Sequence, residues 1–504
     1  MPRFVLRVLV VIGVFGATLS CGPRARGGAG GAAADPPQLA AISEADLRRD
    51  LFALAGPAMR GREAGTVDEM RASMWLAERA REAGLAPGGD DGTYFQLWPM
   101  RRTHLAPGGR LELGGGALRM MEDVVVVTPT TARGDWPVLY AGEGREADVA
   151  GVDLAGKAVA VVLSEPEGMP PLGRELSARR YATLAVRQRA AFLTQRGAAA
   201  VILVSDSVAD GQFDNIGAGW ARGSYAIDRP FRDDGGQTPP PPPTPVLWLR
   251  RRSLDLVRRP GVRLVADLRT QSFVVQGVNV VARAPGADPA LRGQYVLYSA
   301  HQDGLGVRYA WEGDSVWSGA DDNATTSVAL LAIGRALVRA PARRSALFVW
   351  HGAEEVGLLG STYHATHLTV PRDSIVAVLN GDMIGRGAPD TAALLGSQPP
   401  NRNAPALVAM ALGANARVAH FAIDSSWDRP THPEGFFRRS DHWPYARDAG
   451  LPVVYFSTLL HPDYHTPRDD PDRIDYPKLA RMARWMYATG WAAGNAEGRV
   501  VVER

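Results

Sequence analysis

Cysteine is almost absent from this chain, whose 504 residues contain only Cys21. A chain with one cysteine forms no disulfide within itself, and without a cysteine after position 21 no thiolate can bind a metal in the folded body. Any metal must therefore be held by His, Asp and Glu side chains.

Lysine is also scarce, and neither sign of charge dominates. Lys157 and Lys478 are the only lysines among 56 basic residues, which 53 acidic residues nearly balance to a net charge of +3. This balance of charge predicts no nucleic-acid partner. The preference for arginine over lysine is attributed to the base composition of the genome and not to a function. A hydrophobic content of 46% over 504 residues excludes a disordered chain and predicts two or three globular units.

The N-terminus carries an export signal. Two arginines, Arg3 and Arg7, precede an apolar run over residues 8–19, and Cys21 follows. The run is shorter than a membrane span, so residues 1–21 are predicted to be a signal peptide. The run 18–21, Thr-Leu-Ser-Cys, resembles a bacterial lipobox, so we expect lipid anchoring at Cys21 in the periplasm or outer cell envelope, and a secreted protein otherwise. Membrane contact is expected through this anchor alone.

Composition divides the rest of the chain into four parts. Gly, Ala and Pro predict a flexible tether, two amphipathic helical patterns open the body, short β-rich runs follow, and apolar strands then alternate with helices. The corresponding ranges are 22–41, 42–121, 122–269 and 270–504.

The last part has the pattern of an α/β fold. Short apolar runs at 294–300, 345–350, 374–379 and 451–457 are separated by helical stretches, including 327–339, 358–367 and 405–412. Strand, turn and helix in alternation predict a mixed, mainly parallel central sheet with helices on both faces.

Polar residues follow each of these apolar runs. In order along the chain they are His301 and Asp303, Asp321 and Asp322, Glu354 and Glu355, Asp382, and His461, Asp463 and His465. Ligands of such sheets bind beyond the carboxyl ends of the strands, and nitrogen and oxygen donors without cysteine suit Zn²⁺. One ion needs three or four of these residues, whereas two ions sharing a carboxylate need five and leave one acid free for proton transfer.

Five motifs in this order resemble metallopeptidase family 28, the co-catalytic zinc aminopeptidases. They are Ser299-Ala-His-Gln-Asp303, Gly319-Ala-Asp-Asp-Asn-Ala324, Ala353-Glu-Glu-Val-Gly357, Asn380-Gly-Asp-Met383 and Asp463-Tyr-His-Thr-Pro467. Gly61-Arg-Glu-Ala-Gly65 and Arg439-Ser-Asp-His442 support the match. The resemblance implies a phosphorylase/hydrolase-like zinc-peptidase fold, and it implies that residues 122–269 are an inserted protease-associated domain.

The resemblance also implies the roles of individual residues. His301 and Asp382 would bind one Zn²⁺, Glu355 and His465 would bind a second, and Asp321 would bridge the two ions. Glu354 would be the general base, and the implied reaction removes N-terminal residues from peptides with a free N-terminus.

Several further roles are expected around this set. Asp303 is placed to orient His301, and Asp469 to act likewise near His465. His442, Tyr445 and His461 are expected to line a substrate pocket, and Tyr445 and Tyr464 are both candidates for an oxyanion-stabilising hydroxyl. The run Ala324-Thr325-Thr326 replaces the family's usual Ala-Ser-Gly and adds bulk beside the metals.

Three other functions remain open. A carboxypeptidase and a glutaminyl cyclase share the implied fold, although a cyclase typically works with one zinc ion. A catalytically dead peptide-binding protein is the third, but it would have no need of Glu354. The sequence predicts no oligomeric state.

Overall fold

The computed structural model describes residues 35–503, apart from residues 171, 174–175, 229–242 and 312. The predicted signal peptide, Cys21 and most of the tether lie outside these residues. The end of the predicted tether is folded, because Leu39–Ala41 form a short 3-10 helix. No helix in the described ranges is long and apolar enough to cross a membrane.

The larger of two extended sheets contains ten described strands. Nine of them form a continuous row, and β1 (Ala86–Pro87) pairs with β12 beside it. In spatial order the row is β19 (Ala422–Ile423), β18 (Thr391–Leu395), β20 (Val453–Ser457), β17 (Ile375–Gly381), β13 (Tyr295–His301), β16 (Ser345–His351), β12 (Thr270–Ala284), β2 (Phe95–Leu105) and β9 (Ser224–Ile227).

Four neighbouring strands at the centre of this sheet are parallel. β13 pairs with β16 and β17, and β17 pairs with β20, all in parallel, while β12 and β18 join on either side in antiparallel. The predicted mixed sheet is confirmed, and its parallel part is chiefly these four strands. Because parallel strands end at the same edge, the loops that follow them meet there.

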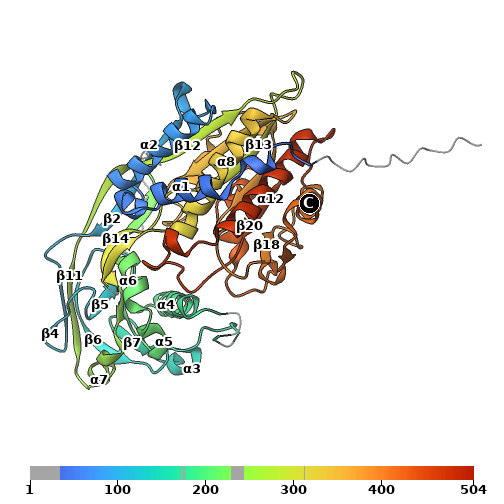
Figure 1. The fold of residues 1–504 in the computed structure, drawn as a ribbon. Helices are drawn as coiled ribbons and strands as arrows, with labels where there is room; N and C mark the ends of the chain where they lie inside the picture. The colour runs from blue at the N-terminus through green and yellow to red at the C-terminus, as the bar shows by residue number, and fades with distance from the viewer. Residues whose placement is uncertain (1–34, 171, 174–175, 229–242, 312, 504) are drawn as a thin grey trace, which may run out of the picture. The chain divides into compact units, whose positions relative to one another are not determined.

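Helices cover both faces of the larger sheet, as predicted. Alternate side chains of β13 point to opposite faces, so Val296 and Tyr298 pack into one apolar cluster and Leu297 packs into another. The first cluster includes buried residues of α1 (Glu44–Leu54), α2 (Val67–Glu82), α8 (Thr325–Arg339), α10 (Pro405–Ala414) and α12 (Tyr476–Asn495), of which several are visible in Figure 1. The second includes residues of α9 (Leu359–Thr366) and α11 (His442–Arg447).

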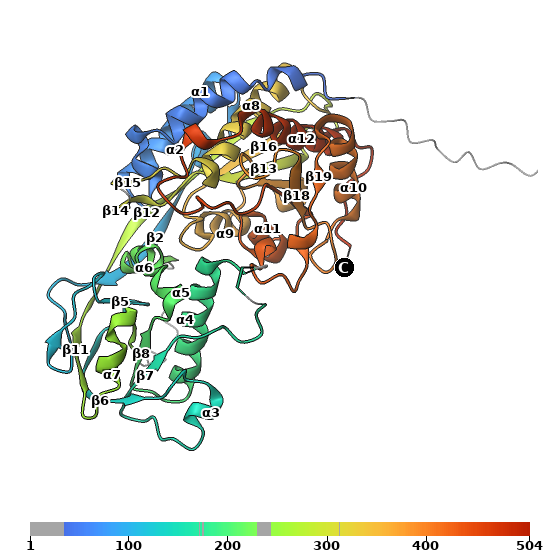
Figure 2. The ribbon, with the colours of Figure 1, turned by 60° about the horizontal axis from the view of Figure 1, so that its bottom comes forward.

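The smaller sheet has eight strands and its own apolar clusters. In spatial order it runs β4 (Gly116–Ala117), β3 (Arg110–Leu113), β11 (Arg263–Leu268), β6 (Ala132–Tyr140), β7 (Ala158–Val162), β8 (Ala200–Val204), β10 (Val246–Leu249) and β5 (Val124–Val126). One face is covered by α4 (Ala178–Gln195), α5 (Ser207–Asp210) and α6 (Phe213–Ala221), and α3 (Glu146–Val149) lies near them, while α7 (Leu254–Val257) packs on the other face. Figure 2 shows α4 alongside β7 and β8.

The smaller sheet is more closely joined to the larger one than the predicted range 122–269 implies. It begins at Arg110, because β3 pairs with β11. The strand β9 lies inside the predicted range, yet it pairs with β2 of the larger sheet. A hairpin of β14 (Gly306–Trp311) and β15 (Asp314–Trp317) forms a third, two-stranded sheet. That the β-rich region is a protease-associated domain stays a prediction.

Candidate metal centre

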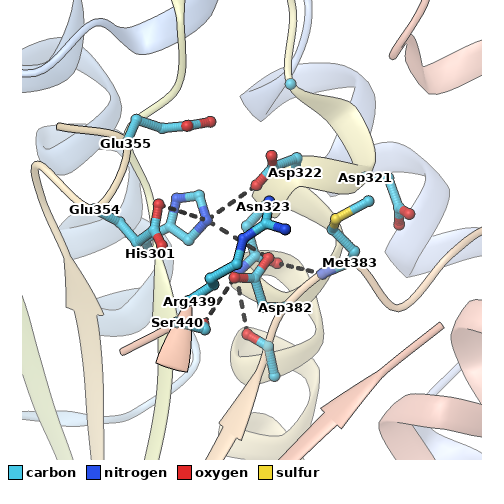
Figure 3. Close-up of polar contacts among 12 residues, drawn as sticks. His301, Asp321, Asp322, Asn323, Glu354, Glu355, Asp382, Met383, Arg439 and Ser440 are labelled. Carbon is cyan, nitrogen blue, oxygen red and sulfur yellow. Dashed lines mark hydrogen bonds and ion pairs between the residues drawn. The ribbon is translucent and has the colours of Figure 1, made fainter. Parts of the chain in front are cut away.

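The polar residues that follow the central strands converge at one edge of the larger sheet (Figure 3). β13 ends at His301, and Asp382 comes directly after the end of β17. Glu354 and Glu355 lie in the loop after β16, and His465 lies in the loop between β20 and α12. Residues separated by more than 160 positions in the sequence are thus brought together because parallel strands share an edge.

Asp322 presents one carboxylate oxygen to each of two groups of potential metal ligands. Its Oδ1 lies 3.1 Å from Nε2 of His301, and its Oδ2 lies 3.0 Å from Nε2 of His465. Asp382 completes the first group, with Oδ1 at 3.6 Å from Nε2 of His301, and Glu355 completes the second, with Oε2 at 3.0 Å from Nε2 of His465. A carboxylate shared between two such groups is the arrangement expected of a two-metal site.

Donor atoms in both groups lack hydrogen-bond partners among the described residues. Nε2 of His301, Oδ1 of Asp382 and Nε2 of His465 are buried and unpartnered. Buried polar atoms are normally paired, so these atoms fit a cation that would bind them together. Two imidazoles and three carboxylates, with no cysteine, are a donor set suited to zinc.

The charges in the cluster favour a cation as well. Burial lowers the pKa of the His301 imidazole, but the nearby charges of Glu354 and Asp382 outweigh it and raise the pKa overall. Burial raises the pKa of Asp382, because a buried carboxylate is poorly solvated. Divalent ions would offset this crowding of negative charge.

The structure does not place Asp321 in the predicted bridging position. Its side chain is directed away from both groups (Figure 3): Oδ1 accepts a hydrogen bond of 2.7 Å from the backbone N–H of Gly385, and Oδ2 lies 3.4 Å from Nε2 of His461. Asp322 occupies the position between the groups instead. The two neighbouring aspartates lie in an irregular turn before α8, where the backbone sends successive side chains in different directions, and the sequence does not show which one faces inward.

Glu354 lies beside the first group of ligands, where a residue that transfers protons during the reaction is expected. Its Oε2 is 3.9 Å from Nε2 of His301, and its side chain is 11% exposed. Burial raises the pKa of this carboxyl group. A carboxyl group with a raised pKa that still reaches solvent is suited to accept and return a proton near neutral pH.

Asp303 supports three of these residues at once. Its Oδ1 and Oδ2 accept hydrogen bonds from the backbone N–H groups of Glu354 (3.0 Å) and Glu355 (3.2 Å). Nδ1 of His301 lies 3.6 Å from Oδ1 of Asp303 and 3.2 Å from its backbone oxygen. Asp303 is therefore positioned next to His301 as expected, and it also fixes the loop that carries both glutamates.

Asp469 does not contact His465 in the expected way. Its carboxylate accepts hydrogen bonds from the backbone N–H groups of Asp321 (2.8 Å) and Asp322 (3.0 Å), so it orients the segment that carries the shared ligand. The ring of His465 instead stacks on Tyr464, with 3.8 Å between centroids.

Two residues without an expected role also support the site. Ser440 donates a hydrogen bond of 2.7 Å to Oδ2 of Asp382, which leaves Oδ1 directed at His301. The buried guanidinium of Arg62 donates to the backbone oxygens of Gln302 (2.7 Å), Ser318 (2.7 Å) and Gly319 (2.8 Å), and burial lowers its pKa to about 10. Both residues lie in motifs that carried the family resemblance, which was the only sequence signal for them.

Two of the three expected pocket residues belong to the core. His442 is buried against Tyr455, with ring centroids 4.6 Å apart. Tyr445 is buried too, and its hydroxyl lies 2.6 Å from Nδ1 of His364. Nε2 of His461 lies 3.4 Å from Oδ2 of Asp321, and its pocket role stays a prediction. Burial against the second apolar cluster excludes His442 and Tyr445 from substrate contact.

Tyr464 remains as the candidate hydroxyl near the two groups. Its ring stacks on His465, and its hydroxyl accepts a hydrogen bond of 3.1 Å from Nη2 of Arg439. Arg439 is also paired with Glu434 at 2.8 Å.

Residues 279–490 match the model of Peptidase family M28. Leupeptin-inactivating enzyme 1 of Streptomyces exfoliatus is 30% identical over 182 residues, which are 35% of this chain and 35% of that protein. An aminopeptidase of Pseudomonas aeruginosa is 33% identical over 128 residues, which are 25% of this chain and 21% of that protein. The matched segments thus span about a third or less of these curated relatives.

Solved structures share the fold over nearly the whole chain. An aminopeptidase from Aneurinibacillus sp. strain AM-1 aligns with a TM-score of 0.61 and 18% identity, covering 94% of this chain and 98% of that one. BSAP, a zinc aminopeptidase from Bacillus subtilis, aligns with a TM-score of 0.59 and 17% identity, covering 92% and 98%. The zinc-peptidase fold expected from the sequence is therefore confirmed.

Proposed function

From the match of residues 279–490 to the model of Peptidase family M28, we propose that this chain is a zinc-dependent aminopeptidase. The observation that carries the proposal is the placement of Asp322 between His301 and His465, with one oxygen 3.1 Å and the other 3.0 Å from the two imidazoles. The family match supports a metallopeptidase, and the relatives named as aminopeptidases support cleavage at the N-terminus.

Two zinc ions fit this arrangement. His301 and Asp382 would hold the first, Glu355 and His465 the second, and Asp322 both. When bound, such a pair supplies Lewis acidity for the scissile carbonyl and lowers the pKa of a water molecule so that it attacks at neutral pH. Asp303, Asp469 and Ser440 hold the ligands in place, so the site is organised before substrate arrives.

Glu354 would move the proton in this reaction. Its Oε2 lies close enough to the first group, 3.9 Å from Nε2 of His301, to accept a proton from the attacking water and deliver it to the leaving amine. The Tyr464 hydroxyl, held by Arg439 beside His465, is placed to donate a hydrogen bond to the oxygen that gains charge.

A mass-spectrometric time course on a peptide pool tests this function. The pool contains peptides with free N-termini, acetylated N-termini and N-terminal glutamine. The zinc-loaded protein should shorten free N-termini stepwise, leave acetylated peptides intact, and stop when a chelator is added. Loss from C-termini would make the protein a carboxypeptidase, ring closure of N-terminal glutamine without hydrolysis would make it a cyclase, and no change would favour a peptide-binding protein.

We also propose that the protein is exported and lipid-anchored at Cys21, on the basis of the basic, apolar and lipobox pattern of residues 1–21. Expression in a bacterial host with radiolabelled palmitate tests this. The wild-type chain should carry the label in the membrane fraction, and the Cys21→Ser variant should not. An unlabelled wild-type chain would refute the anchor.

A further inference from the structure

The β-rich part of the chain contributes side chains to the surroundings of the metal centre. The first turn of α4 contacts the segment that precedes α11: the backbone N–H of Ser177 donates to Oε1 of Glu434 (3.2 Å), and Nε of Arg180 donates to the backbone oxygen of Pro433 (3.1 Å). Helix α4 packs on the smaller sheet, so this sheet has a fixed connection to the site.

Arg179, between these two residues, is linked to a proposed zinc ligand. Its Nη1 donates a hydrogen bond of 2.7 Å to Oδ1 of Asn215 in α6. Nδ2 of Asn215 in turn donates to the backbone oxygen of His465 at 3.2 Å. The chain of contacts places the guanidinium near the second group of ligands, and the charges of Glu355 and Asp322 both act on it.

No carboxylate among the described residues pairs with Arg179. Its neighbours differ in this respect, since Arg439 pairs with Glu434 and Arg222 pairs with Glu63. A guanidinium has five donors, and hydrogen bonding to Asn215 uses only one of them. Burial accordingly lowers the pKa of Arg179, because a desolvated cation without an anionic partner is destabilised.

Arg308 is a second cation of the same kind close by. Nε of Arg308 donates to the backbone oxygen of Leu305 at 3.0 Å, and its guanidinium lies 5.0 Å from the ring centroid of Trp317. It too has no carboxylate partner among the residues that the structure describes. Burial lowers the pKa of Arg308 to about 10. The charge of Glu355 acts to raise this pKa, and the charge of Arg179 acts to lower it.

Neither cation is needed to neutralise the centre once zinc is present. The three carboxylate ligands and Glu354 carry negative charge that two divalent ions already balance. The two guanidinium groups then remain as positive charge in the surroundings of the second ligand group, with no carboxylate partner among the described residues. Guanidinium groups of this kind bind carboxylates in a bidentate manner.

We propose that Arg179, with Arg308 beside it, binds a carboxylate of the peptide substrate. The inference rests on the proposed peptidase function and adds the substrate class: short peptides whose carboxylate lies close to the scissile bond. That carboxylate is either the C-terminus of a dipeptide or an acidic side chain next to the cleaved bond, and the chemistry of recognition is the same for both.

Matched substrate pairs test the proposal and identify the source. The zinc-loaded full chain is assayed on Leu-Ala against Leu-Ala-amide, and on Leu-Glu-amide against Leu-Gln-amide. We expect kcat/KM to be about ten- to a hundredfold higher for the charged member of at least one pair, as one charge-assisted contact would give. Preference in the first pair assigns the C-terminal carboxylate, and preference in the second assigns the side chain.

The variants should act on this preference alone. Arg179→Gln should remove the preference for the charged substrate, chiefly by raising KM for that substrate. Arg179→Lys should keep part of the preference, because lysine retains the positive charge but not the bidentate geometry of the guanidinium. Arg180→Gln is the matched control, since that side chain donates to Pro433 and should leave the preference unchanged. Retention of the wild-type preference in Arg179→Gln would overturn the proposal. If this variant fails to fold, Arg308→Gln replaces it, with the same expectation and the same contrary outcome.

A binding measurement separates this inference from the proposed function. Calorimetric titration of the Glu354→Gln variant with Leu-Ala and Leu-Ala-amide should show the same preference without turnover, and Glu354→Gln/Arg179→Gln should lose it. If the wild-type chain hydrolyses none of the peptides, the proposed function fails even where this binding preference is present. If it hydrolyses charged and uncharged members equally well, the carboxylate site is wrong and the peptidase stands.

Discussion

The carboxylate of Asp469 accepts a hydrogen bond of 3.0 Å from the backbone N–H of Asp322. This contact, together with the one to Asp321 at 2.8 Å, fixes the turn that directs Asp322 between the two imidazoles. The residue that bridges the ligand groups is thus selected by an acid located 147 positions away in the sequence.

The neighbouring aspartates provide a matched pair of variants. Asp322→Ala should lose both zinc ions, because this carboxylate is shared by both groups, whereas Asp321→Ala should keep metal since its oxygens are directed at Gly385 and His461. Zinc content of the purified variants, measured by plasma mass spectrometry after gel filtration, checks this. Two ions retained in Asp322→Ala, or both lost in Asp321→Ala, would return the bridging role to Asp321.

Replacing Glu354 with Gln should separate catalysis from metal binding. The change removes the proton acceptor but keeps the side-chain volume, so we expect kcat to fall at least about a hundredfold with zinc content near that of wild type. Steady-state kinetics and metal analysis on one preparation provide both readings. Wild-type turnover in this variant would exclude Glu354 as the base.

Arg62 should be important for stability as well as for the site. Arg62→Met leaves four backbone oxygens, those of Leu54, Gln302, Ser318 and Gly319, without their donor, and we expect the free energy of unfolding to fall by about 3 kcal/mol. Urea unfolding of the metal-free protein measures this without a contribution from zinc. Arg71→Gln is the control, because Arg71 is exposed and forms a surface ion pair with Asp68; equal effects of the two variants would contradict the role of Arg62.

His442 should make the fold sensitive to acid. Burial lowers its pKa to about 3, below its usual value near 6.5, so the unfolded chain binds a proton that the folded chain does not. Its contribution to stability is therefore complete above about pH 6.5 and is lost as the pH falls toward 3, by up to about 1.4 kcal/mol per pH unit.

The His442→Phe variant tests this dependence. Urea unfolding of both proteins, free of metal, at pH 7.5, 5.5 and 4.5 should show a smaller loss of stability on acidification in the variant. The exposed His367 supplies the control, His367→Gln, which should follow wild type. Parallel pH profiles for wild type and His442→Phe would show that the buried imidazole is not responsible.

Much of the fold was predictable because apolar periodicity is a local signal. The helix expected over 327–339 is α8 (Thr325–Arg339), and the strand expected over 345–350 is β16 (Ser345–His351). Local patterning does not predict the long strand β12, since its first half is largely exposed and its pairing with β2 involves residues far away in the sequence. Likewise β9 was assigned to the β-rich part, although hydrogen bonding joins it to the larger sheet.

The sequence by itself determined the chemistry of this protein. Near absence of cysteine restricts metal binding to nitrogen and oxygen donors, and strand ends followed by His301, Glu354, Glu355, Asp382 and His465 place those donors at one sheet edge. Only the tertiary structure decided which of two adjacent aspartates faces the ligand groups, that His442 and Tyr445 belong to the core, and that Arg179 is hydrogen-bonded to Asn215 with no carboxylate partner among the described residues. The physical reason is that side-chain direction depends on backbone dihedrals and on contacts between distant segments, such as Asp469 with Asp322, that no local pattern records.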